Sequence, residues 1–394
     1  MKNIDRDILN CSILIIEDDY LGRTIIKEIF KQQGFTRVED AENGVDGLEK
    51  ISTFCPNLVV LDCIMPEMDG IECCKRIRQN SDPKIANVPV LFQTSLDGIA
   101  DKARFFEAGA TDYLSKPIDP HEITARAVVH LESEVMIKKQ NDYKTRMGQE
   151  LDTARLTQRI LIPSDKAIAN VEKDYKLRIS GHYEPCSELG GDFWGFKSIS
   201  HNELAIYMVD FAGHGVNAAL NVFRLHALMQ AMDTANTPSA FLTQLNAHLA
   251  PLLPIGHFAT MFYGVIDTKH NTLSYASAAS PTPILFTSGG SEYKLLESSG
   301  TVLGAVKDST YKMIEVDFNK GDCLLLYSDA LVETPTQKDE AISIDKWADY
   351  FRTNLKKKIQ SSTDVMDLLL KEFRLNCSAN LKDDLTINAY YRNG

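Results

Sequence analysis

The hydrophobic positions in the first third of the chain form short apolar runs that alternate with amphipathic stretches. The five runs are 12–16, 38–42, 58–61, 88–92 and 113–115. Short apolar strands that alternate with helices are typical of a parallel sheet with helices on both faces. The pattern therefore predicts a doubly wound, five-stranded α/β domain over residues 10–130.

A long helical pattern follows this domain. Asp119 is suited to the cap of the helix and Pro120 to its first turn, and no further proline occurs before Pro163. Six apolar residues with helical spacing form a stripe along this helix, and a polar stretch interrupts the stripe. The six residues are Leu131, Val135, Tyr143, Met147, Leu151 and Ala154. Such a stripe fits either a short coiled-coil homodimer or a helix that packs on its own domains. Both interpretations stay open, and both make residues 131–163 a helical linker that continues to about Leu161.

Residues 164–394 again alternate between strand-like runs and helical stretches. Strands are expected around 175–183, 204–210, 324–328 and 385–390, and helices over 218–234, 238–253, 344–359 and 362–376. This order is consistent with an α/β/β/α sandwich, in which two sheets face each other and helices cover the outside. The last expected strand ends close to the end of the chain, so no appended kinase or DNA-binding module is expected.

The composition narrows the classes of function. The 394 residues carry a net charge of −12 and both halves of the chain are acidic, which argues against a nucleic-acid-binding surface. The eight cysteines have no regular spacing and several lie in apolar runs, as expected of reduced thiols. The sequence shows no signal peptide and no apolar run of about eighteen residues. We therefore expect a cytoplasmic protein that binds neither nucleic acid nor membrane.

Polar side chains follow four of the expected strands in the first domain. In this fold, functional groups lie at the carboxyl ends of the strands. Glu17, Asp18 and Asp62 are carboxylates that repel one another unless a divalent cation binds. Lys116 and Thr94 can then neutralise and hydrogen-bond an incoming phosphoryl group. Asp62 is the natural nucleophile, because an aspartyl phosphate is a labile intermediate that suits a switch.

The same residues lie in motifs that resemble those of two-component receiver domains. The motifs are IIEDD at 15–19, NLVVLDCIMPEMDG at 57–70, TS at 94–95 and AGATDYLSKP at 108–117. The resemblance implies that Glu17, Asp18 and Asp62 hold Mg²⁺ and that a sensor histidine kinase phosphorylates Asp62. It further implies that Thr94 and Tyr113 form the switch pair and that Lys116 contacts the phosphate. It also implies a cis peptide bond between Lys116 and Pro117.

A second set of acids lies at the ends of expected strands in the last domain. Its members are Asp192, Asp210, Asp329 and the adjacent Asp383 and Asp384. Asp210 precedes a turn with Gly213 and Gly215, which lets its carboxylate and the carbonyl of Phe211 point at one spot. Carboxylates that lack Cys or His in zinc spacing suit Mg²⁺ or Mn²⁺. The sequence leaves open which of Asp383 and Asp384 is the ligand.

The motifs around these acids resemble the type 2C metal-dependent Ser/Thr phosphatases (PPM family), in their SpoIIE-like bacterial branch. They are GGDF at 190–193, VDFAGHG at 209–215, FATMFYG at 258–264, GTVLG at 300–304, LLLYSDALVE at 324–333 and DDLTI at 383–387. The resemblance implies two Mn²⁺ or Mg²⁺ ions, bridged by Asp210, that activate water for attack on a phosphate monoester. The chain departs from the pattern at Gly195, where a second acid is usual. It also departs at Ser280, where the pattern has histidine, and at Ala330, where it has glycine.

These observations together predict a response regulator with a phosphatase output. Phosphorylation of Asp62 would control the removal of phosphate from phosphoserine or phosphothreonine in a partner protein, for which the resemblance implies a STAS-type anti-sigma factor antagonist. The alternative is a catalytically weak adaptor that binds a partner under receiver control. The three departures favour the adaptor, whereas the retained cluster of repelling acids favours the enzyme. A receiver that only sequesters phosphate would leave the last domain unexplained.

Overall fold

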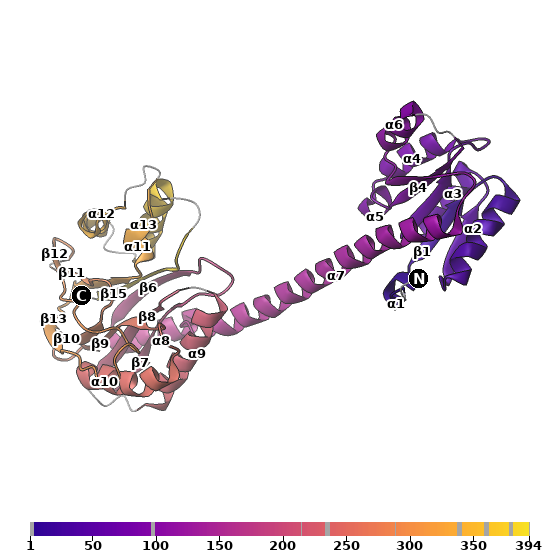
Figure 1. Cartoon of the computed structure of the whole chain (residues 1–394). Helices are drawn as coiled ribbons and strands as arrows, with labels where there is room; N and C mark the ends of the chain where they lie inside the picture. The colour runs from indigo at the N-terminus through magenta and orange to yellow at the C-terminus, as the bar shows by residue number, and fades with distance from the viewer. Residues whose placement is uncertain are drawn as a thin grey trace. The chain divides into compact units, whose positions relative to one another are not determined.

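The computed structural model describes residues 4–95, 99–213, 215–232, 237–287, 289–336, 341–357, 362–377 and 381–393. The chain divides into two compact units, residues 1–147 and residues 148–394. The first unit is built around one sheet and the second around two (Figure 1). In the described part of the chain, no helix has the length and apolar character needed to cross a bilayer.

A five-stranded parallel sheet forms the centre of the first unit. Its order is β2-β1-β3-β4-β5, and every neighbouring pair is parallel. The strands are β1 (Ser12–Ile16), β2 (Arg37–Ala41), β3 (Leu58–Asp62), β4 (Val90–Thr94) and β5 (Asp112–Ser115). The predicted doubly wound α/β domain is confirmed, and each predicted strand lies within two residues of the observed one.

Helices cover both faces of this sheet. They are α1 (Arg6–Leu9), α2 (Tyr20–Gln32), α3 (Gly44–Phe54), α4 (Gly70–Arg78), α5 (Pro83–Ala86), α6 (Ile99–Glu107) and the start of α7 (Pro120–Arg159). One face packs against α1, α2 and α7 through residues such as Phe30 and Ile123. The other packs against α3 to α6 through residues such as Ile51 and Phe105. Strands buried on both faces explain the continuous apolar runs of the sequence.

Polar side chains cap the helices that follow the first three strands. The carboxylates of Asp19 and Asp69 and the amide oxygen of Asn43 accept hydrogen bonds from backbone N–H groups in the first turns of α2, α4 and α3. Each cap removes an unpaired donor at a helix start. The loops at the carboxyl ends of β1, β2 and β3 are therefore fixed beside the predicted acids.

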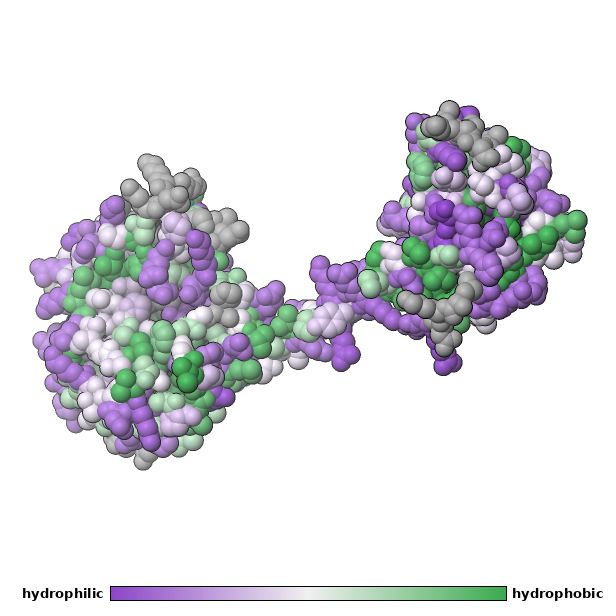
Figure 2. Space-filling view, viewed as in Figure 1, coloured by the Kyte–Doolittle hydropathy of each residue, from purple (hydrophilic) through white to green (hydrophobic). Residues whose placement is uncertain are grey.

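Helix α7 begins in the first unit and ends in the second. Its first turn is capped by Asp119, and it ends two residues before the predicted Leu161. Leu131 is buried and Val135 packs against the core of the first unit. Leu131 and Val135 therefore pack on the helix's own domain, as one of the two interpretations predicts. Tyr143 is exposed, and the visible middle of α7 is mostly hydrophilic (Figure 2).

Two five-stranded antiparallel sheets form the centre of the second unit. Their orders are β13-β10-β9-β8-β7 and β12-β11-β14-β15-β6. The strands are β6 (Leu177–Glu184), β7 (Asp192–Ser198), β8 (Glu203–Phe211), β9 (Ala259–Asp267), β10 (Thr272–Ala278), β11 (Ile284–Thr287), β12 (Glu292–Leu295), β13 (Ile314–Asp317), β14 (Cys323–Tyr327) and β15 (Leu385–Arg392).

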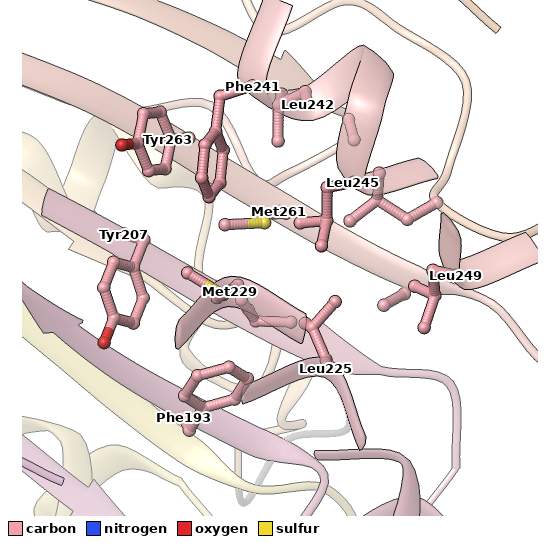
Figure 3. Packing of buried hydrophobic residues seen from close by; sticks show 14 of the residues in the cluster. Phe193, Tyr207, Leu225, Met229, Phe241, Leu242, Leu245, Leu249, Met261 and Tyr263 are labelled. Atoms are coloured by element: carbon pink, nitrogen blue, oxygen red, sulfur yellow. The ribbon is translucent and has the colours of Figure 1, made fainter. Parts of the chain in front are cut away.

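Helices cover the outer faces of both sheets. They are α9 (Val216–Ala231), α10 (Pro238–Leu249) with a 3₁₀ turn (Ala250–Leu252), α11 (Ala330–Glu333), α12 (Ile344–Lys357) and α13 (Ser362–Asn376). Helix α8 (Asp165–Tyr175) instead packs Val171 and Tyr175 into the core between the sheets. One core lies under α9 and α10, where Phe241 stacks on Tyr263 with ring centroids 4.0 Å apart (Figure 3). A second core lies under α11 to α13, and a third lies between the sheets. The predicted α/β/β/α sandwich is confirmed.

Element ends differ from the prediction at a few places. The strand predicted from residue 175 begins at Leu177, because Tyr175 ends α8 and Lys176 closes that helix in the left-handed conformation. The helix predicted over 238–253 ends at Leu249 and continues as a 3₁₀ turn. The predicted ends at 234 and 359 lie outside the described residues.

Candidate functional site

The first acidic cluster lies at the carboxyl ends of β1 and β3. Glu17 directly follows β1, and Asp62 ends β3, the neighbouring strand. Carboxylate oxygens of Glu17, Asp18 and Asp62 lie within 4.8 Å of one another. Glu17 and Asp62 are buried, whereas Asp18 is exposed. The fold thus brings the three predicted acids together, and oxygen donors in this spacing fit one Mg²⁺ ion.

Lys116 compensates the two buried acids of this cluster. Its Nζ lies 2.9 Å from Oδ1 of Asp62 and 2.9 Å from Oε2 of Glu17. Burial raises the pKa of both carboxyl groups, and the hydrogen bonds from Lys116 oppose this rise. Burial alone would lower the pKa of Lys116, but its bonds to the two acids outweigh this effect and raise it. The lysine therefore stays charged and holds two buried carboxylates together.

Thr94 lies on β4, which pairs with the strand of Asp62, and Tyr113 lies on β5, the next strand beyond it. Thr94 ends β4 and is buried, and Tyr113 lies in β5 with its ring edge-on to Phe106 at a centroid distance of 6.1 Å. The amide of Lys116 donates to the carbonyl of Thr94 at 2.7 Å, and the Lys116–Pro117 bond is cis. Glu17, Asp62, Thr94 and Lys116 therefore lie at or just after the carboxyl ends of their strands, whereas Tyr113 lies within β5, opposite Phe92.

Strand register builds one side of the second acidic cluster. Asp192 opens β7 and pairs with Asp210 of β8, which pairs in turn with Thr260 of β9. Residues directly opposite each other in antiparallel strands point to the same face, with Cβ atoms about 5 Å apart. Two carboxylates and one hydroxyl therefore stand in a row across three strands.

The second sheet supplies acids that face this row. Asp329 follows β14 at the start of α11, and Asp383 precedes β15, which pairs with β14. The hydroxyl of Thr386, in β15, donates to Oδ2 of Asp192 at 2.6 Å. The charges of Asp329 and Asp383 also act on Asp210. The acids of both sheets therefore meet at one end of the sandwich.

The adjacent Asp383 and Asp384 differ in what their side chains contact. Asp384 is buried, and its two oxygens accept hydrogen bonds from the backbone amides of Cys186, Gly191 and Asp192. Asp384 thus holds the turn that precedes Asp192. Asp383 is only partly buried and lies with Cys186 and Asp384 in a group whose ligand atoms are within 4.8 Å of one another. This arrangement favours Asp383 as the cation ligand.

Burial and mutual repulsion raise the pKa of three acids in the second cluster. Burial is the larger cause and neighbouring carboxylates add to it, which raises the pKa of Asp210 to about 7 and that of Asp329 to about 6. The pKa of Asp192 rises well above its usual range for the same reasons. Among the described residues, one buried oxygen of Asp192 and one of Asp329 have no hydrogen-bond partner. This donor set fits divalent cations, which would satisfy these oxygens.

The backbone carbonyl of Phe211 lies beside the loop that carries Asp192. A Cβ atom on Gly191 would lie 2.8 Å from this carbonyl oxygen, so only glycine permits the approach. The Phe211 side chain is buried in the core under α9 and α10. His214, in the following turn, lies outside the described residues.

A cleft of about 460 Å³ opens next to Asp210 and Asp329. The turn that carries Ser280 and Thr282 contributes to its lining, as do Glu333 of α11 and Ile344 of α12. Its described lining contains no Lys, Arg or His. Acids and neutral hydroxyl groups form the polar part of this lining.

The three departures from the family pattern lie in different local settings. A Cβ atom on Gly195 would lie 2.4 Å from Oη of Tyr207, so an acid at this position would displace the tyrosine. Ser280 follows Ala279, whose φ of 54° is a left-handed conformation that favours glycine. Ala330 is the first residue of α11, directly after Asp329. None of these departures replaces one of the four acids Asp192, Asp210, Asp329 and Asp383.

The sequence did not predict the contact between α7 and the loop that carries Asp192. Gln158, near the end of α7, is buried; it donates to the carbonyl of Gly190 at 2.6 Å and accepts from its amide at 3.2 Å. Arg155, one turn earlier, donates to the carbonyl of Glu188 at 3.0 Å. An amide side chain on a helix carries no sequence signal of this role. The end of α7 therefore clamps this loop, by which we mean that its side chains hydrogen-bond the backbone of the loop.

Two family models match separate parts of the chain. The model described as Response regulator receiver domain matches residues 13–128. The model described as Stage II sporulation protein E (SpoIIE) matches residues 200–392. The first match contains the first acidic cluster, and the second contains Asp210, Asp329 and Asp383.

Individual relatives share the first part of this organisation. Response regulator MprA of Mycobacterium ulcerans is 36% identical over 118 residues, which are 30% of this chain and 49% of that protein. Regulator of RpoS of Escherichia coli is 27% identical over 228 residues, which are 56% of this chain and 64% of that protein. The chain thus spans about half to two thirds of the length of these curated relatives.

A solved structure shares the fold of the second part. The SiaA-PP2C domain of Pseudomonas aeruginosa has a TM-score of 0.55 at 21% identity, over 63% of this chain and 98% of that domain. At this identity the likeness shows the fold alone, which is that of a PP2C phosphatase domain. The chain therefore joins a response regulator receiver domain to a SpoIIE domain with the fold of a PP2C phosphatase.

Proposed function

We propose that this protein is a response regulator whose receiver, phosphorylated on Asp62, controls a metal-dependent phosphatase. Its substrate would be phosphoserine or phosphothreonine in a partner protein. The observation that carries the proposal is the row of Asp192 and Asp210 that faces Asp329 and Asp383. Buried, mutually repelling carboxylates destabilise a fold without cations, so a pure scaffold has no physical reason to keep them.

The residues of the second cluster would have different roles in the proposed reaction. Asp192, Asp210, Asp329 and Asp383 would hold two Mn²⁺ or Mg²⁺ ions, with the carbonyl of Phe211 as a further oxygen donor. Bound cations would supply positive charge for the phosphoryl oxygens and lower the pKa of water, so that hydroxide is available to attack phosphorus. The chain orients the first acid through the hydroxyl of Thr386. It holds the loop before that acid through Asp384 and Gln158.

For the receiver, we propose that Asp62 accepts a phosphoryl group from a sensor histidine kinase. Glu17, Asp18 and Asp62 would hold Mg²⁺ at this step. Lys116 already contacts Asp62, so its charge is in place to neutralise the added phosphate. Its bond to Glu17 lets it shift between the two acids without leaving the cluster.

Helix α7 is the proposed route from the receiver to the phosphatase. Thr94 and Tyr113 would form the switch pair that responds to phosphorylation of Asp62. Tyr113 lies in β5, which leads directly into α7. At its other end, α7 clamps the loop of the second cluster through Gln158. A change at the start of the helix would therefore reach a segment that positions Asp192.

The proposed partners follow from the same organisation. The phosphorylated substrate would be a STAS-type anti-sigma factor antagonist, and the protein would act in the cytoplasm. A second copy of the chain would pack on α7, where Val129, Met136 and Tyr143 are exposed and follow one another at seven-residue intervals. This spacing is the heptad of a coiled coil.

Phosphate release from a phosphoserine peptide tests the proposed activity. Full-length protein with Mn²⁺ should release inorganic phosphate, and excess chelator should abolish the release. If the protein binds the phosphopeptide but releases no phosphate with Mn²⁺ or Mg²⁺, the phosphatase proposal is wrong. That result would favour the adaptor, which the departures at Gly195, Ser280 and Ala330 support.

A further inference from the structure

Thr260 stands beside Asp210 with an unused hydroxyl group. The two residues are directly paired between β8 and β9 and therefore point to the same face. Thr260 lines the 460 Å³ cleft and is partly exposed to it. Within the described ranges, its side chain makes no hydrogen bond. A polar group free to bind therefore lies one strand away from Asp210.

Ser280 presents a second hydroxyl to the same cleft, in a fixed position. Its Oγ lies 2.9 Å from Oγ of Ser277 and 3.3 Å from Oγ of Ser298. Its amide donates to Ser277 at 3.1 Å, and its carbonyl accepts from Ser298. The backbone of this turn is therefore held on both sides. Asp210, Thr260 and Ser280 also line a small second cavity that contacts the cleft residues Pro281 and Tyr327.

The polar lining of the cleft is of two chemical kinds. Asp210, Asp329 and Glu333 are acids, whereas Thr260 and Ser280 carry neutral hydroxyl groups, and Thr260 stands directly beside Asp210. The described lining offers no cationic side chain for a phosphate. Once cations neutralise the acids, the phosphoryl oxygens that face away from them still need hydrogen-bond donors. Only neutral hydroxyl groups stand there to provide them among the described side chains.

We propose that Thr260 and Ser280 form a neutral donor wall that hydrogen-bonds the phosphoryl group and the leaving oxygen of the substrate. Thr260 would donate from its free hydroxyl, and Ser280 would exchange its hydrogen bond to Ser277 for one to the substrate. This inference rests on the proposed phosphatase function and deepens it. In the reaction, the water oxygen bonds to phosphorus and the bond from phosphorus to the serine or threonine oxygen breaks. One proton of the water ends on the leaving oxygen and the other stays with the phosphate. The wall donates hydrogen bonds as negative charge develops and gives up no proton.

Single hydroxyl deletions test the donor wall. T260V keeps the shape of the side chain and removes its hydroxyl, S280A removes the second one, and T260S restores a hydroxyl at position 260. With saturating Mn²⁺, T260V and S280A should each lose about 10- to 100-fold in kcat/KM on a phosphoserine peptide, as expected for a hydrogen bond to a charged group. T260S should recover most of the loss. T272V, a matched change in β10 away from the cleft lining, should not alter the activity.

Two further measurements distinguish hydrogen bonding to the substrate from a role in Mn²⁺ binding. Loss on p-nitrophenyl phosphate should be smaller than on the phosphopeptide, because its leaving oxygen develops less charge. The Mn²⁺ concentration for half-maximal activity should stay unchanged in T260V, while calorimetry should show weaker binding of inorganic phosphate. If T260V equals an active wild type, or if only its Mn²⁺ requirement changes, the inference is overturned and the proposed function stands. If the wild type releases no phosphate, both are overturned.

Discussion

The two acidic clusters of this chain stabilise buried negative charge in different ways. In the first, Lys116 contacts both Glu17 and Asp62, so a side chain of the protein itself supplies the compensating positive charge. In the second, the pKa of Asp210 rises to about 7 and that of Asp329 to about 6, and the described cleft lining offers no Lys or Arg. The first cluster is charged and ready for a covalent change at one acid. In the second, burial and mutual repulsion favour the protonated form of the acids, and bound cations would shift them toward the charged form.

The difference follows from how each cluster is built. Parallel strands of one sheet deliver the first acids to a common edge, and the loop after β5 places Lys116 over them. The second cluster joins the strand ends of two sheets, so acids arrive from both sides. The buried charge is therefore compensated by Lys116 in the first unit, whereas the described cleft lining of the second unit contains no Lys or Arg.

Removal of the phosphoacceptor should have the largest effect. Wild-type protein with Mg²⁺ and acetyl phosphate should form an acid-labile acyl phosphate, and D62A should form none because the nucleophile is absent. Radiolabelled phosphate followed on an acid gel measures the product. D142A, a change at an exposed acid of α7, is the matched control and should label like the wild type. Equal labelling of D62A and wild type would show that another residue is the acceptor.

D210N should abolish the proposed phosphatase activity. In the absence of divalent cations, it should also stabilise the folded protein. We expect at least about 10³-fold lower phosphopeptide hydrolysis, because the acid shared by the proposed cations is lost. Without cations at pH 8, the melting temperature should rise, since a repelled buried charge is removed. Mn²⁺ should no longer raise it. D308N, at an exposed acid, should change neither quantity, and hydrolysis by D210N at the wild-type rate would refute the cation site.

The raised pKa values predict how stability depends on pH. Asp210 and Asp329 have folded pKa values of about 7 and about 6, above the usual value of 3.8. The folded state therefore binds more protons than the unfolded state between these limits, and stability without cations falls as pH rises from about 4 to about 7. Bound Mn²⁺ should offset this fall and raise the melting temperature more at pH 8 than at pH 5. Scanning calorimetry of full-length protein would measure both effects, and an equal Mn²⁺ effect at both pH values would contradict the sign.

Gln158 should affect the second cluster through the loop that carries Asp192. Q158A removes two hydrogen bonds to Gly190 and leaves buried backbone groups unpaired. We expect about tenfold lower phosphatase activity at limiting Mn²⁺ and partial recovery at high Mn²⁺, because the acid is displaced and not removed. Labelling of Asp62 should be unaffected. Q149A, on an exposed part of the same helix, is the matched control. If Q158A has the wild-type Mn²⁺ requirement, the clamp does not position the cluster.

The sequence allowed the first cluster to be predicted more completely than the second. Glu17 and Asp62 directly follow apolar strands of a parallel sheet, where the fold class itself places side chains at a common edge. The second cluster depends on the register between antiparallel strands, which hydrophobic pattern does not specify over long distances. The place of Thr260 beside Asp210 is such a case.

Other features could not be predicted because they depend on contacts between distant residues. Asp383 and Asp384 are adjacent in sequence, and only the backbone amides of a loop far away in the chain distinguish them. Gln158 lies in a helix that the sequence did predict, yet its partner Gly190 lies beyond an intervening helix and strand. Patterns of apolar residues define elements, but they do not define which polar groups meet.

The smallest effect concerns the turn that holds the donor wall of the second cluster. Ala279 adopts the left-handed conformation, which costs a residue with a side chain about 1–2 kcal/mol. A279G relieves this cost, but glycine also gains about 0.4–1 kcal/mol of entropy in the unfolded chain. The difference should raise the free energy of unfolding by about 1 kcal/mol or less, which is a melting-temperature increase of about 2–4 °C at most. A240G, at a helical position of α10 with no such strain, should instead destabilise by about 1 kcal/mol. If both variants destabilise equally, Ala279 is not strained, and the position of Ser280 is held by its hydroxyl neighbours alone.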